Sequence, residues 1–165
     1  FAPNGDPKYS EADFDSKDKA LWAIGVGLES NDKFRATTGT DTKDTIYAVD
    51  GIFKYKGFAL QAEYFTKDAE PETGSDFKDE GWYAQAGFML GAKRQWEIAA
   101  RYGQIDPSDL KSGDERTEIG GALSYYYNKH NLKVQADWRQ LEDEAGNSGK
   151  GTKSNEIRVQ TQFIF

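Results

Sequence analysis

Apolar and polar side chains alternate with a period of two along most of the chain from residue 21 onward. In the first run, Trp22, Ile24, Val26 and Leu28 fall on one face, and small or polar residues fall on the other. This period is typical of β-strands, because successive side chains of a strand point to opposite faces. Eight such runs occur, over residues 21–30, 47–55, 58–67, 82–90, 96–104, 118–127, 132–139 and 156–165. The sequence therefore predicts an all-β fold with eight recognisable strands.

The connections between these runs alternate between short and long. Lys56-Gly57 and residues 128–131 form tight hairpin turns, and residues 91–95 form a slightly longer one. The other connections are rich in charged residues, Gly, Ser and Thr, and we expect solvated loops over residues 29–44, 68–79, 105–115 and 142–154. Short turns at one end and long loops at the other indicate an antiparallel transmembrane β-barrel of the outer-membrane type.

The apolar face of the runs carries aromatic residues near its two ends and aliphatic or small residues between them. Two aromatic rings around an aliphatic band match the girdles that lie at headgroup level on a lipid-facing wall. The alternative, a soluble barrel whose apolar face surrounds a ligand, does not require these rings. We expect the girdle to comprise Trp22, Tyr47, Tyr55, Phe58, Tyr64, Trp82, Trp96, Tyr102, Tyr127, Trp138 and Phe165.

The last run ends in Gln162-Phe163-Ile164-Phe165, with Phe165 in phase with the apolar face. An aromatic residue at this place resembles the terminal signal by which outer-membrane barrels of Gram-negative bacteria are recognised for assembly. We therefore expect the barrel assembly machinery to be a partner of the final strand. The other expected surroundings are outer-membrane lipid and lipopolysaccharide.

Composition excludes several other classes of protein. The chain has 165 residues and no cysteine, and this length suits one domain. Its net charge of −7 argues against a nucleic-acid partner, because a phosphate backbone needs a basic face. No run of apolar residues is long enough for a transmembrane helix. We divide the chain into residues 1–20, a polar tail or inter-strand connection on the short-turn side, and residues 21–165, the eight-strand β-barrel segment.

Much of the chain resembles the carboxyl-terminal half of the phosphate-selective porin O/P family. The resemblance rests on the order and spacing of residues 8–13, 49–55, 58–65, 82–88, 97–103, 115–124, 135–140 and 155–165. It implies a sixteen-stranded, homotrimeric porin of the bacterial outer membrane, of which eight strands would be half a barrel. A closed eight-stranded barrel with an acidic amino-terminal tail is the alternative. In either case strand edges in lipid must be paired, because each unpaired backbone group there costs several kcal/mol.

The polar face of the strands carries six basic and six acidic residues. The acidic ones are Asp50, Glu63, Glu97, Glu118, Asp137 and Glu156, and the expected pore-lining basic residues are Lys54, Lys67, Arg101, Lys133, Arg139 and Arg158. A balanced wall of this kind favours pairing between neighbouring strands, which keeps a lumen wet. A sharper hypothesis, motivated by the resemblance, is a basic track of Arg101, Arg139, Arg158 and Lys133 that lowers the barrier for anions.

The resemblance also implies a constriction by a long loop that folds inward and carries basic residues. By its place in the strand order, the first long loop, with Lys33, Arg35 and Lys43, corresponds to such a loop. The same segment carries Asp32, Asp41 and Asp44, so the resemblance does not extend to phosphate-binding residues one by one.

Enzymatic activity is not expected. A hydrolytic site would be expected at the long-loop end, with a nucleophile beside a base. The single histidine, His130, lies in a tight turn at the opposite end, so it cannot serve as that base. No catalytic residue, metal site or cofactor is indicated. The sequence predicts an outer-membrane porin for small hydrophilic solutes, including anions such as phosphate. The alternative is a closed, plugged eight-stranded barrel that anchors or displays its loops without transport.

Overall fold

The computed structural model describes residues 2–5, 7, 12–15, 18–35, 41–129, 131–144 and 151–164, and for residues 33–35 the backbone only. It is built of β-strands joined by turns and loops, and no helix in the described part of the chain is long and apolar enough to cross a membrane. The strands are β1 (Leu21–Arg35), β2 (Asp41–Tyr55), β3 (Phe58–Pro71), β4 (Phe77–Leu90), β5 (Trp96–Asp106), β6 (Arg116–Asn128), β7 (Leu132–Asp143) and β8 (Thr152–Phe163). The prediction of eight strands is confirmed.

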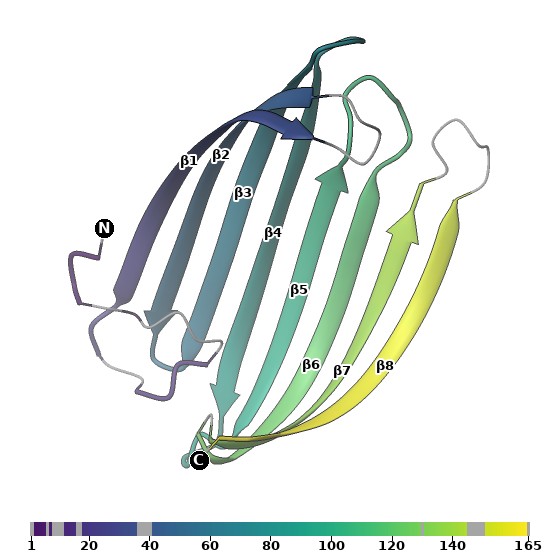
Figure 1. The fold of residues 1–165 in the computed structure, drawn as a ribbon. Helices are drawn as coiled ribbons and strands as arrows, with labels where there is room; N and C mark the ends of the chain where they lie inside the picture. Colours follow the sequence, from purple (N-terminus) through teal and green to yellow (C-terminus); the bar gives the residue numbers. More distant parts are fainter. Residues whose placement is uncertain are drawn as a thin grey trace.

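All eight strands form a single curved sheet in which each strand pairs antiparallel with the next one along the chain (Figure 1). The order is β1 to β8, and within the described residues β1 and β8 share no ladder, so the sheet is open. The structure is thus a half-barrel in form, one of the two arrangements expected, and its two outer strands are edges.

Tight turns join strand pairs at one end of this sheet, which we call the short-turn end. Lys56 and Gly57 between β2 and β3 both have positive φ angles, of 50° and 91°. Two consecutive positive φ angles make a type I′ turn, whose twist matches that of the strands on either side. Close hairpins of this kind fix the register, and register decides which side chains face each way.

The ladder register places the apolar positions of neighbouring strands opposite one another. Val26 pairs with Val49, and Ile98 with Leu123, on a face that we call the outer face. Its aliphatic residues are open to the surroundings, with Val26 83% and Ile157 79% exposed. A sheet that leaves such residues uncovered needs an apolar environment, which lipid supplies.

The strands extend well beyond the alternating runs at the long-loop end. The expected loops at residues 29–44 and 68–79 were too long, because β1 and β2 occupy residues 29–35 and 41–44 and β3 and β4 occupy residues 68–71 and 77–79. The expected loops at residues 105–115 and 142–154 are shortened less, by residues 105–106, 142–143 and 152–154. Cross-strand ion pairs support these extensions, such as Lys43 with Glu70 at 3.5 Å and Lys153 with Glu142 at 3.1 Å. Alternation of apolar residues marks only the part of a strand that lies in lipid, so this pattern does not detect the polar extensions.

This correction affects the expected constriction loop. Lys33 and Arg35 lie in β1 and Lys43 lies in β2, so the prediction that all three belong to an inward-folded loop is wrong. Arg35 pairs with Asp41 in the ladder, which leaves only residues 36–40 between the two strands, and these fall outside the described residues.

Residues 12–14 lie on the opposite, polar face of the sheet at the short-turn end. Ala12 forms a small buried cluster there with Met89 and Tyr126, and Phe14 packs against it. We call this polar side the inner face. The expected tail or connection over residues 1–20 thus includes a packed part. His130 and Phe165 lie outside the described residues.

A charged substitution on the outer face should destabilise the protein more than one on the inner face. In the full-length protein folded into lipid vesicles, Val159→Arg should lower the free energy of unfolding by about 2–4 kcal/mol, because it places a guanidinium in the hydrocarbon region. Gln160→Arg, one residue along β8 on the inner face, should change it little. Urea unfolding followed by tryptophan fluorescence measures both, and equal losses would contradict the assignment of faces.

A candidate pore wall

One row of inner-face residues crosses six strands at the same height. The register pairs each member with the next, from β3 to β8, in the order Gln61, Gln85, Arg101, Gly120, Arg139 and Glu156. Because every ladder step preserves the face, these side chains all point to the same side of the sheet. Five of the six residues, all except Glu156, line a hollow on this part of the sheet.

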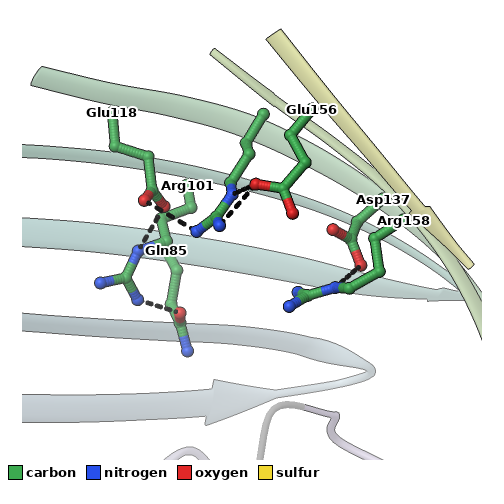
Figure 2. Close-up of polar contacts among 7 residues, drawn as sticks. Gln85, Arg101, Glu118, Asp137, Glu156 and Arg158 are labelled. Atoms are coloured by element: carbon green, nitrogen blue, oxygen red, sulfur yellow. Dashed lines mark hydrogen bonds and ion pairs between the residues drawn. The ribbon is translucent and has the colours of Figure 1, made fainter. Parts of the chain in front are cut away.

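Arg101 is held by three neighbours, of which Figure 2 shows Gln85 and Glu118. Its Nη1 donates to Oε1 of Gln85 at 3.0 Å, and its Nε lies 3.3 Å from Oε1 of Glu118. The guanidinium also stacks 4.1 Å from the centre of the Tyr83 ring. A planar cation fixed by a carboxylate, an amide and an aromatic face keeps one orientation although it is exposed.

Arg139 repeats this arrangement two strands further along. Its Nε and Nη2 lie 2.7 and 2.6 Å from Oε2 of Glu156, and its Nη1 lies 3.7 Å from Oε2 of Glu118. Glu118 therefore bridges Arg101 and Arg139. Two arginines and two glutamates form one neutral network across β5 to β8.

Arg158 is bound more loosely. Its Nε donates to Oδ1 of Asp137 at 3.2 Å, and in the described part of the chain this is its one polar contact (Figure 2). The two terminal nitrogens of its guanidinium remain available to water or to a solute. Exposed pairs of this type contribute about 0.2–1 kcal/mol each, so their main effect is on the charge of the wall and not on stability.

Glycines make room for these long side chains. A Cβ at Gly120 would lie 3.1 Å from the backbone oxygen of Trp138 and 3.4 Å from Cβ of Arg139. At Gly103 a Cβ would come within 3.3 Å of Cβ of Tyr83, the residue on which Arg101 stacks. The absence of a side chain at these positions lets the guanidinium groups lie along the wall.

A family model described as phosphate-selective porin O and P matches residues 22–165, which is nearly the whole chain. The chain belongs to this family. No curated protein and no solved structure shows a significant match to it. Membership identifies an outer-membrane porin of bacteria and places the chain in a family of channels, not of enzymes. The resemblance found in the sequence is confirmed.

Two further basic residues of the porin's inner face are not open to the hollow. Lys54 is 5% exposed and its Nζ donates to the backbone oxygen of Ala12 at 3.2 Å. Lys133 is 4% exposed and lies 5.7 Å from the centre of the Tyr126 ring. Both point to the face expected of pore-lining residues, but Lys54 is covered where Ala12 binds it and Lys133 is buried beside Tyr126.

Lys67 lies on the inner face near the long-loop end. Its Nζ is 2.5 Å from Oδ2 of Asp79 on β4 and 5.7 Å from the centre of the Phe77 ring. Of the six predicted basic residues, Arg101, Arg139 and Arg158 are therefore the ones that the structure brings together beside the hollow.

The expected aromatic girdle lies on the outer face of the porin where it is described. Trp82 packs against Tyr102 at 5.3 Å between ring centres near the long-loop end, and Trp96 against Tyr125 at 4.8 Å near the short-turn end. Tyr125 was missed, although its period-2 position indicates it. Most of the predicted set is well exposed, namely Tyr47, Tyr55, Tyr64, Trp82, Trp96, Tyr102, Tyr127 and Trp138.

Charge at the short-turn end lies outside the membrane-spanning region. The hydrogen bond with the Tyr55 side chain, followed by the contact with Asp18, raises the pKa of Lys56 above its ordinary value. Lys56 also lies 3.5 Å from Oδ1 of Asp18. Because the pKa moves upward, this lysine stays charged throughout the neutral range.

The close packing at Gly120 predicts a selective loss of stability. Gly120→Val should lower the free energy of unfolding by about 1–3 kcal/mol, because the added carbons meet the β7 backbone and displace Arg139. Gly121→Val is the matched control, since a Cβ there lies 3.7 Å from its nearest neighbour and faces lipid. Urea unfolding in vesicles distinguishes them, and two equal midpoints would show that Gly120 is not tightly packed.

Proposed function

We propose that this porin forms the wall of a passive diffusion channel for small hydrophilic solutes, with a weak preference for anions such as phosphate. The observation that carries the proposal is the contrast between the two faces of the sheet. The outer face is aliphatic with aromatic belts, and the inner face beside the hollow carries arginines, carboxylates and amides. Such a wall is stable only with lipid on one side and water on the other.

The balance of charge argues for a channel of broad specificity. Arg101 and Arg139 are compensated by Glu118 and Glu156, so this part of the wall presents no net field to a passing ion. Solutes of either sign can pass a neutral, hydrated wall, because pore selectivity follows from rings or tracks of uncompensated charge.

Arg158 supports the anion preference. Its carboxylate partner Asp137 engages only Nε, so its terminal nitrogens are available beside the hollow, whereas all three guanidinium nitrogens of Arg139 are engaged by carboxylates. A planar guanidinium suits the oxygens of phosphate, which it contacts through paired N–H groups. Lys133, which belonged to the expected basic track, is covered and adds little to it.

The open edges support a larger assembly. β1 and β8 each present one side without a described strand partner, and unpaired backbone groups in lipid cost several kcal/mol each. We propose that further strands meet both edges to close a wide barrel, which assembles as a trimer in lipid and lipopolysaccharide through the barrel assembly machinery. Eight strands alone would leave an interior filled by side chains, but sixteen leave an aqueous channel.

The test is planar-bilayer conductance of the full-length protein, with the reversal potential measured across a KCl gradient. We expect discrete steps and a small anion preference. Arg158→Ala should shift the reversal potential toward cations, because it leaves Asp137 uncompensated, and Asp137→Asn should shift it toward anions.

Lys129→Ala is the control, because this exposed lysine lies in a short turn away from the wall. A silent bilayer from protein shown to be folded and inserted would overturn the channel. Steps that neither wall substitution alters would overturn the placement of Arg158 and Asp137 in the conducting path.

A further inference from the structure

Three consecutive residues of the amino-terminal segment, Ala12, Asp13 and Phe14, are bound to the inner face of the sheet at the short-turn end. The backbone oxygen of Ala12 accepts a hydrogen bond from Nζ of Lys54 at 3.2 Å. Oδ2 of Asp13 accepts one from the backbone N–H of Gly57 at 2.8 Å. The Phe14 ring meets the Tyr126 ring edge-on, with 4.8 Å between their centres.

The residues that make these contacts are buried, whereas few other described side chains of the sheet are. Ala12 is 2% exposed, Asp13 5% and Tyr126 1%. The Tyr126 hydroxyl donates to Oε2 of Glu97 at 2.5 Å, so the residue that receives Phe14 is itself anchored to β5. A buried carboxylate with a backbone donor and an aromatic pair make a specific attachment and not a loose association of a tail.

The attachment reaches across the inner face from β2 to β6. Lys54 belongs to β2, Met89 to β4 and Tyr126 to β6, and all three point inward. Residues 12–14 therefore occupy space at the short-turn mouth through which a solute travelling along the inner face would pass. They also cover Lys54, a basic residue that would otherwise face that path.

We propose that Ala12, Asp13 and Phe14, seated on Met89 and Tyr126, form a constriction that sets the size limit for solutes at the short-turn mouth. The inference rests on the proposed function, since it describes how that channel is narrowed. It places the narrowing element at the short-turn end and not in the long loops, whereas Arg101 and Arg139 lie midway along their strands.

Single-channel conductance of the full-length protein tests this constriction. Asp13→Ala removes the acceptor for the Gly57 N–H, and Phe14→Ala removes the ring that packs on Tyr126. Each should raise the conductance and admit larger neutral polyethylene glycols into the channel. Asp15→Ala is the matched control, because it removes an exposed aspartate of the same segment and should change neither quantity.

The outcomes separate this inference from the channel itself. If the unaltered protein does not conduct, the proposed function fails. If it conducts and both substitutions leave the conductance and the polymer limit unchanged, the channel stands and the constriction is overturned.

Thiol labelling of protein shown to be folded provides a second measurement of the same contact, independent of conductance. The chain contains no cysteine, so a cysteine introduced by Met89→Cys is the only target for a charged, water-soluble reagent. It should react slowly in the otherwise unaltered protein and faster when Asp13→Ala is added. Gln160→Cys, on the open inner face of β8, should react quickly in both. Fast labelling of Met89→Cys in the unaltered background would overturn the constriction.

Discussion

Pairing of backbone groups between neighbouring strands is the constraint on which the rest of this porin depends. Within lipid no water is available to peptide N–H and C=O groups, so every one of them must be satisfied by the sheet. The strict order β1 to β8, with short hairpins at one end, achieves this between neighbouring strands and leaves only the outer edges of β1 and β8 open in the described sheet. It also fixes the alternation of faces, and the arginine network exists because the register places Arg101, Gly120 and Arg139 in one row.

The two faces of the sheet share one backbone but meet different surroundings, lipid on the outer face and water on the inner face. On the outer face, aliphatic side chains such as Ile98 need only contact lipid, so they make few specific interactions. On the inner face the charged groups are hydrated yet still organised, with Glu118 shared by two arginines. Small residues contribute to this organisation, because Gly120 and Gly103 leave the space in which the long side chains lie.

The strand number and the two faces follow from the alternation of residues such as Trp22, Ile24 and Val26, because lipid imposes a strict period of two. The family was recognised by resemblance, from the order and spacing of segments such as residues 49–55 and 155–165. The placement of Lys33 and Arg35 could not be predicted in this way, since ladders in water continue through polar residues and leave no apolar signal. The seat of Phe14 was missed for another reason. Its partner Tyr126 is an aromatic residue on the polar face, a local exception whose distant partner the sequence does not name.

The linear order of the strands has a consequence for how the chain folds. Every strand contacts only its neighbours in sequence, so loop closure is inexpensive at each step and the sheet can grow hairpin by hairpin as it enters the membrane. The contact between Phe14 and Tyr126 is different, because it joins positions separated by five strands. It can form only after β6 has joined the sheet, so the attachment of residues 12–14 to the inner face would be a late event in folding.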